Sequence, residues 1–138
     1  MKIMAIDYGD AHTGIAISDP TGFLAGFTTV IDAYRPEVVV ERIAALAKEH
    51  GVEELVLGHP INMDGTRGPR SEKAQAMKTL LEETTSLPVV LWDERRTTID
   101  AHQILMNSGK NAKKRKKVVD AVAATLILEG YLTYKKTH

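Results

Sequence analysis

The chain has 138 residues, 43% of them hydrophobic and none of them cysteine. This length suits one domain with a single core, and the absence of cysteine excludes disulfides, thiolate metal sites and a cysteine nucleophile. Lysine plus arginine and aspartate plus glutamate each number 18, so the net charge gives no sign of a strongly basic nucleic-acid binder.

The first third of the chain predicts three strands in an antiparallel meander, because short apolar runs alternate with turn signals. The expected strands are residues 2–7, 13–18 and 26–31. Asp7 and Asp10 interrupt the first run long before a signal-peptide core or a membrane span could form. We therefore expect a cytoplasmic protein that does not contact membranes.

From Pro36 onward, helical spacing alternates with short β-rich runs. The expected elements are a helix from Pro36 to about residue 47, a strand at 54–58, a helix from a Ser71 cap to about Thr84, a strand at 88–92, a helix from Thr97 to about 109, and a helix from about Lys114 to Tyr131. Such an order predicts right-handed crossovers between parallel strands. The expected fold is a single α/β domain over residues 1–138, with three meander strands and two parallel strands in one sheet.

Carboxylates follow two of the predicted strands. Asp7 ends the first strand, and Asp93 and Glu94 follow the strand at 88–92. A carboxylate at the mouth of a buried strand is costly unless a metal, a cation or hydrogen bonds offset its charge. Strand alternation sends Asp93 and Glu94 to opposite faces, so only one of them should point toward Asp7. Asp7 taken alone could equally be an ordinary turn residue.

Asp120 is the only charged residue in the apolar stretch from Val118 to Leu128. A helix this hydrophobic packs on the sheet over much of its circumference, which predicts that Asp120 is partly buried or lies at the edge of a cleft. The alternative is an exposed aspartate in an early helical turn, favoured there by the helix dipole.

Asp7, Asp93 or Glu94, and Asp120 come from three separated segments. Gathering their charges in one place would cause strong repulsion, which a divalent ion relieves. Hard oxygen ligands of this kind suit Mg²⁺ or Mn²⁺, and such ions promote phosphodiester hydrolysis. This pattern indicates a metal-dependent nuclease, and it leaves open whether Asp93 or Glu94 is the partner of Asp7.

A basic run precedes or begins the last predicted helix, and no acid lies between Asp100 and Asp120. The run consists of Lys110, Lys113, Lys114, Arg115, Lys116 and Lys117. Cations are disfavoured at a helix N-terminus, whereas a phosphate backbone would bind them. The alternative is an ordinary solvated loop.

A second group of candidate phosphate contacts follows the fourth predicted strand. Gly58, Gly65 and Gly68 can bring backbone N–H groups close to a phosphate, and Arg67 and Arg70 supply positive charge. The same glycines would equally suit a long loop with no ligand. The sequence favours neither interpretation.

Four motifs follow one another along the chain: Asp7-Tyr8-Gly9 with Thr13-Gly14-Ile15-Ala16, LGHPINMDGT at 57–66, WDERRTT at 92–98 and KVVDAVAA at 117–124. Together they resemble the YqgF/RuvX family, which was first described as Holliday junction resolvases and later as pre-16S rRNA nucleases. The first motif is weak by itself, but the Asn-Met-Asp-Gly and Asp-Glu-Arg-x-Thr-Thr patterns are specific. The resemblance spans essentially the whole chain.

The resemblance implies a ribonuclease H-like fold and a role in maturing the 5′ end of precursor 16S rRNA. It implies acidic site residues at Asp7, in the Asp93–Glu94 pair and at Asp120, and it suggests that Asn62, Arg95 and Thr98 line the same cleft. The implied substrate is structured RNA, with DNA junctions as a second candidate, and we expect a monomer or a weak homodimer.

One departure from related resolvases matters. Those enzymes carry an additional acid in the middle of the sequence, whereas the fourth strand here ends in Gly58-His59-Pro60. Glu94 or Asp93 must then replace it from the fifth strand, and of the two we favour Glu94 as the partner of Asp7. Trp92 is expected to be a core residue rather than a base-stacking platform, because it lies within a buried strand.

Two other functions compete with catalysis on RNA. The first is a non-catalytic RNA- or protein-binding module of ribosome assembly on the same fold. The second follows from the Asp-x-Gly-x-x-x-x-Gly pattern of Asp7 to Gly14, which also resembles the first phosphate motif of actin-like and sugar kinase ATPases. Those proteins close two such domains around a nucleotide, and this chain has room for one.

Overall fold

A mixed five-stranded sheet forms the centre of the computed structural model, which describes residues 1–21, 25–59, 68–93 and 112–137. The elements are β1 (Ile3–Asp7), β2 (His12–Ser18), β3 (Ala25–Asp32), α1 (Pro36–His50), β4 (Glu54–His59), α2 (Pro69–Thr85), β5 (Val89–Asp93) and α4 (Ala112–Thr137). The strand order is β3-β2-β1-β4-β5, with β1, β2 and β3 antiparallel and β1, β4 and β5 parallel. This confirms the expected sheet of three meander strands and two parallel strands.

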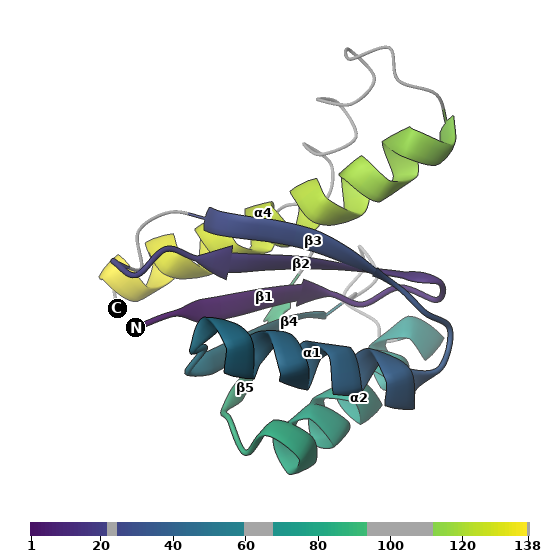
Figure 1. The fold of residues 1–138 in the computed structure, drawn as a ribbon, viewed down its shortest axis with the longest axis horizontal. Helices are drawn as coiled ribbons and strands as arrows, with labels where there is room; N and C mark the ends of the chain where they lie inside the picture. Colours follow the sequence, from purple (N-terminus) through teal and green to yellow (C-terminus); the bar gives the residue numbers. More distant parts are fainter. Residues whose placement is uncertain (22–24, 60–67, 94–111, 138) are drawn as a thin grey trace.

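Helices cover both faces of the sheet. Figure 1 shows α1 and α2 on one face and α4 across the other. Because side chains alternate along each strand, the sheet contributes to two separate cores. The core beneath α1 and α2 includes Met4, Ile6, Ile15, Leu55, Leu57, Ile43, Met77 and Leu81. The core beneath α4 includes Ile3, Ala5, Ala16, Val56, Trp92, Ala124, Ile127, Leu128 and Tyr131.

The predicted helix beginning at Pro36 is confirmed as α1. Pro36 occupies the first turn, where a missing N–H costs nothing, and Gly51 ends the helix at φ 68° with its N–H on the carbonyls of the last turn. Val39, Ile43 and Ala47 are buried, as their spacing predicts.

Helix α2 begins earlier than predicted. It starts at Pro69 with Gly68 as its N-cap, so Ser71 is not a capping residue. Ser71 is fully buried, and its Oγ lies 2.6 Å from Nε2 of His59 in β4. A serine within hydrogen-bond reach of a buried imidazole satisfies both groups, and tertiary packing therefore overrides the local capping preference.

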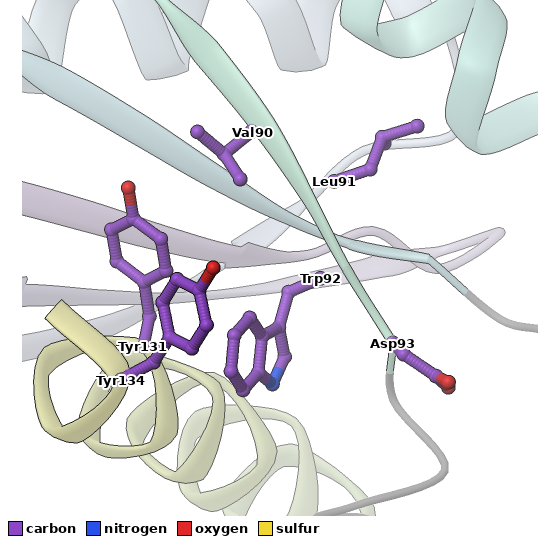
Figure 2. Close-up of a pocket in the computed structure, with 6 residues that line it drawn as sticks. All are labelled: Val90, Leu91, Trp92, Asp93, Tyr131 and Tyr134. Atoms are coloured by element: carbon purple, nitrogen blue, oxygen red, sulfur yellow. The ribbon is translucent and has the colours of Figure 1, made fainter. Parts of the chain in front are cut away.

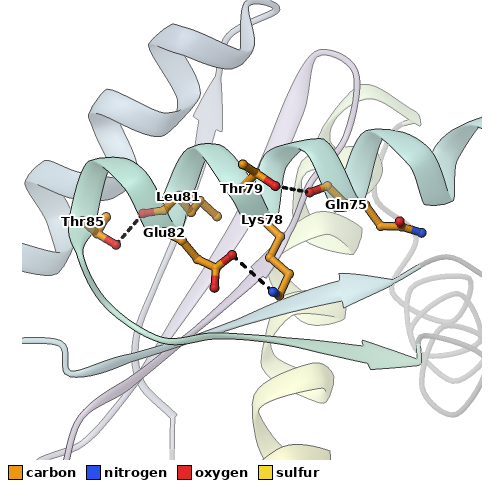
Figure 3. Close-up of polar contacts among 6 residues, drawn as sticks. All are labelled: Gln75, Lys78, Thr79, Leu81, Glu82 and Thr85. Carbon is orange, nitrogen blue, oxygen red and sulfur yellow. Dashed lines mark hydrogen bonds and ion pairs between the residues drawn. The ribbon is translucent and has the colours of Figure 1, made fainter.

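Helix α2 carries short-range polar contacts (Figure 3). The Lys78 ammonium lies 3.2 Å from the Glu82 carboxylate, and the Thr79 and Thr85 hydroxyls donate to carbonyls four residues earlier. Pairs at this spacing face each other on a helix and stabilise it only modestly. The Lys78–Glu82 and Thr79 contacts are exposed, whereas the Thr85 contact is partly buried, one turn after Leu81.

Helix α4 is longer than predicted. It spans 26 residues, about 39 Å at 1.5 Å per residue, instead of residues 114–131. Its last turns stay with the sheet because Tyr134 packs on Trp92 and Lys135 lies 3.3 Å from Glu54. The helix predicted from Thr97 lies outside the described residues. Within the part of the chain that is described, no helix is both long and apolar enough to cross a membrane.

Candidate active site

The carboxyl ends of the three parallel strands meet at one edge of the sheet. β1 ends at Asp7, β4 at His59 and β5 at Asp93. Open α/β sheets bind ligands beyond this edge, where strand ends and loops converge. The edge is therefore the candidate active site.

Asp7 faces the side of the sheet that α4 covers. Ile3 and Ala5 of the same strand belong to the α4-side core, whereas Met4 and Ile6 belong to the opposite core. Alternation places Asp7 with Ile3 and Ala5. Asp7 is only partly buried, so its carboxylate lies between the packed interior and solvent.

Two glycines flank Asp7 on this face. Gly14 of β2 is the direct partner of Asp7 in the antiparallel pair. On the other side Ile6 pairs with Leu57, so the next position along β4, Gly58, lies beside Asp7. Neither strand neighbour of Asp7 therefore has a side chain on this face of the sheet.

His59 and Asp93 face the opposite side. His59 is directed toward Ser71 of α2, and Asp93 is the register partner of His59. Trp92 of the same strand packs on the α4 side, so alternation also directs Asp93 away from the face of Asp7 (Figure 2). Of the two candidate acids after β5, the described one therefore does not share a face with Asp7.

The turn between β1 and β2 is held by ion pairs beside this edge. Nδ1 of His12 lies 2.6 Å from the Asp32 carboxylate, and Nζ of Lys73 in α2 lies 3.1 Å from the Asp10 carboxylate. Between them, Tyr8 packs against the α1–α2 core. Burial raises the pKa of the Tyr8 phenol, which keeps it neutral. These contacts fix the backbone on both sides of Gly9.

The N-terminal part of α4 lies at the end of the sheet toward which β1 runs (Figure 1). The basic run expected to precede or begin this helix lies largely within its first two turns, because α4 starts at Ala112. The helical positions are Lys113, Lys114, Arg115, Lys116, Lys117 and, one turn later, Asp120. The structure describes the backbone of these residues and not their side chains.

Several expected site residues lie outside the described residues. They are Asn62, Arg67, Glu94, Arg95, Thr98 and Lys110. Arg70 lies in the first turn of α2, where the backbone alone is described. Among the side chains that are described, no group of three or more histidine, aspartate and glutamate residues is arranged to hold a metal ion.

Sequence reasoning missed the pairing of Asp7 with Gly14 and the cluster around Trp92. The sequence shows Thr13 and Gly14 only as residues of a predicted turn and strand. Local sequence cannot show which residue of one strand pairs with a given residue of another. The assignment of Trp92 to the core is confirmed, since 9% of its surface is exposed.

A family model described as "RuvX: Holliday junction resolvase" matches residues 1–134. A protein of Halothermothrix orenii is 44% identical over 135 residues, covering 98% of this chain and 96% of its own. A Bacillus licheniformis protein is 44% identical over 134 residues, covering 96% of each chain. Both carry the name "Putative pre-16S rRNA nuclease".

Solved structures of nucleases share the fold. RuvC of Thermus thermophilus in complex with a Holliday junction substrate superposes with a TM-score of 0.64 at 14% identity, covering 99% of this chain and 96% of RuvC. Fowlpox virus resolvase with Holliday junction DNA gives 0.56 at 11% identity, covering 99% and 98%. The expected ribonuclease H-like fold is thereby confirmed.

The sequence pattern shared with sugar kinases is accompanied by a similarity in fold. A ROK hexokinase of Thermus thermophilus gives a TM-score of 0.51 at 22% identity, covering 75% of this chain and 38% of the kinase. The common part is one sheet with its helices. It shows a shared fold and nothing about nucleotide binding.

Proposed function

The chain belongs to the RuvX family of Holliday junction resolvases, and from this premise we propose that it is a metal-dependent endonuclease that processes the 5′ end of precursor 16S rRNA. The observation that carries the proposal is the placement of Asp7. Its carboxylate ends a parallel strand at the ligand-binding edge, between two glycines and on the face crossed by α4. Neither of its two strand neighbours carries a side chain that an approaching phosphodiester would meet.

The second acid of the proposed site is Glu94. Trp92 faces α4, and alternation along β5 directs Asp93 to the opposite face. Asp93 therefore does not share the face of Asp7, which supports Glu94 over Asp93 as its partner. This choice also supplies the acid that the end of β4 lacks.

The third acid is Asp120. Ala124 and Ile127 of α4 are buried against the sheet, and position 120 precedes them by four and seven residues. Residues at this spacing share one face of a helix. Position 120 of the α4 backbone therefore belongs to the same series as these buried residues, nearer the start of the helix.

Asp7, Glu94 and Asp120 would hold Mg²⁺ or Mn²⁺. The fit rests on the donor set, because hard carboxylate oxygens are the preferred ligands of these ions, and on the space that Gly14 and Gly58 leave beside Asp7. When bound, the ion would lower the pKa of a coordinated water and offset charge on the phosphate. The protein contributes the position of the carboxylates and the packed face beneath them.

The basic residues would hold the nucleic-acid backbone. Lys113, Lys114, Arg115, Lys116 and Lys117 occupy the first two turns of α4, beside the proposed metal ligands in sequence and on the same element as Asp120. We assign to the same surface Lys110, Arg67, Arg70, Asn62, Arg95 and Thr98. Cations at a helix N-terminus oppose the dipole, which favours an external anion as their partner.

A four-way DNA junction is the second candidate substrate. It is favoured by the description of the family model and by the two resolvases, with Holliday junction ligands, that share the fold. A non-catalytic role in ribosome assembly would use the same basic surface without cleavage. These alternatives differ in what the protein does to each substrate.

One experiment separates them. The purified protein and its Asp7→Asn variant are incubated with precursor 16S rRNA and with a four-way DNA junction, with and without Mn²⁺. We expect cleavage of the precursor only with metal, and a loss of at least about 100-fold in Asp7→Asn with RNA binding retained. Asp10→Asn is a matched control, because the Asp10 side chain is 79% exposed and paired with Lys73.

The possible outcomes are distinct. Cleavage that persists in rigorously purified Asp7→Asn would overturn the catalytic assignment. Cleavage of the junction alone would assign the DNA substrate, and binding without any cleavage would assign the assembly role.

A further inference from the structure

His12 is the first residue of β2 and lies on the same face of the sheet as Asp7. Ala16 of the same strand belongs to the core beneath α4, so alternation places Gly14 and His12 on the α4 side as well. Gly14 is the direct partner of Asp7. His12 is therefore the diagonal neighbour of Asp7, about 7–8 Å away, a spacing that an aromatic side chain can bridge.

The imidazole of His12 is held from β3. Its Nδ1 lies 2.6 Å from a carboxylate oxygen of Asp32, which is also its register partner. A carboxylate only accepts hydrogen bonds, so Nδ1 carries the proton of this contact, and Nε2 of the neutral ring is left as an acceptor. The two ring nitrogens point away from each other. With Nδ1 turned toward β3, Nε2 is turned away from it, and β1 is the strand on the other side of β2.

The backbone around His12 is fixed as closely as its ring. The Ala33 N–H donates to the Ala11 carbonyl at 3.1 Å, which extends the pairing of β2 and β3 past His12. An added Cβ at Gly9 would collide with the His12 carbonyl oxygen, so the turn packs directly on this residue. The His12 side chain is nevertheless 26% exposed. An accessible imidazole whose orientation is set by a third group has the features of a general base.

Two other ionisable side chains of the turn are engaged on the opposite face. Asp10 is paired with Lys73 of α2, and Tyr8 packs against the core beneath α1 and α2. The start of β2 and the N-terminal part of α4 lie at the same end of the sheet (Figure 1). A nucleic-acid backbone held by the basic residues of α4 would therefore pass beside His12.

We propose that His12, oriented by Asp32, is the general base of the nuclease. Water attacks the phosphorus of the phosphodiester held at Asp7, and as the new P–O bond forms, Nε2 of His12 takes a proton from that water. The bond from phosphorus to the leaving ribose oxygen breaks, its electron pair stays on that oxygen, and the oxygen takes a proton from solvent. The imidazolium then returns its proton to solvent. The inference rests on the proposed function and adds to it a catalytic residue, His12, and a positioning residue, Asp32.

Two substitutions of His12 separate proton transfer from a structural role. His12→Ala removes the ring, whereas His12→Asn keeps an N–H donor near the position of Nδ1, so it can still bind Asp32 but cannot take a proton from water. Single-turnover cleavage of precursor 16S rRNA with Mg²⁺ is measured with and without added imidazole, and thermal melts verify that each variant is folded. His50→Asn is the matched control, because His50 contacts the Phe27 ring at the end of α1.

We expect both His12 variants to cleave at least about 100-fold more slowly than wild type, the size of a lost general base, with unchanged affinity for RNA. Imidazole should restore part of the rate of His12→Ala and leave Asp7→Asn inactive, and His50→Asn should match wild type. Asp32→Asn should lose less than His12→Ala. An amide can either donate to Nδ1 or accept from it, so it no longer fixes the proton on that nitrogen.

Cleavage by His12→Asn at the wild-type rate would show that the His12–Asp32 contact only holds the turn, and the inference would fall. A loss in both His12 variants that imidazole does not restore would also overturn it, because it would indicate a part in shaping the site rather than in moving a proton. In either case the nuclease assignment stands if wild type cleaves and Asp7→Asn does not. If wild type does not cleave, the proposed function itself fails.

Discussion

Asp7 lies directly opposite Gly14 in the antiparallel pair of β1 and β2. Directly opposed residues have their Cβ positions roughly 5 Å apart on one face of a sheet, so any side chain at position 14 would touch the Asp7 carboxylate. Gly14 is buried within regular strand pairing. In the proposed site, the absence of a side chain at position 14 is therefore what keeps that side of Asp7 clear.

Gly14→Val should impair cleavage of precursor RNA by about 100-fold, the cost of a misplaced reacting group. The added methyl groups would occupy the space through which a phosphodiester reaches Asp7. Single-turnover cleavage measures the effect, and Gly14→Ala should show a smaller loss. Unchanged cleavage by a folded Gly14→Val protein would contradict the proposed approach to Asp7.

Glu94→Gln should abolish metal-dependent cleavage, whereas Asp93→Asn should retain it within a few-fold. The reason is that Asp93 shares the face of His59 and not that of Asp7. In a calorimetric titration with Mn²⁺, Glu94→Gln should bind the ion more weakly than wild type, whereas Asp93→Asn should bind it as wild type does. Loss of cleavage in Asp93→Asn with cleavage retained in Glu94→Gln would instead make Asp93 the metal ligand.

Neutralising two basic residues at the start of α4, in Lys113→Gln with Lys116→Gln, should weaken RNA binding for every sequence tested. Each lysine that contacts a phosphate contributes about one unit to the slope of log Kd against log salt concentration, so we expect the double variant to lower that slope by about two. Lys48→Gln in α1 is the control. An unaltered slope would exclude these lysines from the backbone contact.

Ser71→Ala should lower the free energy of unfolding by about 1–3 kcal/mol, because it leaves the buried His59 ring without the hydroxyl at 2.6 Å. Thr79→Ala is the matched control, since the Thr79 hydroxyl donates to a carbonyl on the exposed side of α2 (Figure 3). Urea denaturation measures both variants. A loss no larger in Ser71→Ala than in Thr79→Ala would show that the His59–Ser71 contact contributes nothing.

Tyr131 should make the protein sensitive to alkaline pH. Burial first, and then a hydrogen bond to Glu54, raise the pKa of the Tyr131 phenol well above its ordinary value. The neutral phenol stabilises the fold fully below about pH 10, the unfolded value, and this contribution is lost as the pH rises further. Thermal melts from pH 8 to 11 should therefore show a shallower decline for Tyr131→Phe than for wild type or Tyr34→Phe.

Much of the fold could be predicted because its signals are local. The apolar runs ending at Asp7 and Trp92, the helical spacing from Val39 to Ala47, and the alternation of strands and helices depend on sterics between chain neighbours. The errors were at boundaries. Ser71, which the sequence predicts as a cap, is a buried partner of His59, and α4 extends to Thr137 because Tyr134 and Lys135 contact distant residues.

The element types, the mixed sheet and the acids at the strand ends were all predictable from local patterns in the sequence. Which residues lie side by side depends on the fold. Gly14 and Gly58 flank Asp7, Asp93 turns toward His59, and three aromatic rings meet beside β5, because strand register and helix packing join segments that are far apart in the chain. Local patterns specify which face a residue takes relative to its own strand, and only pairing between strands specifies what stands next to it.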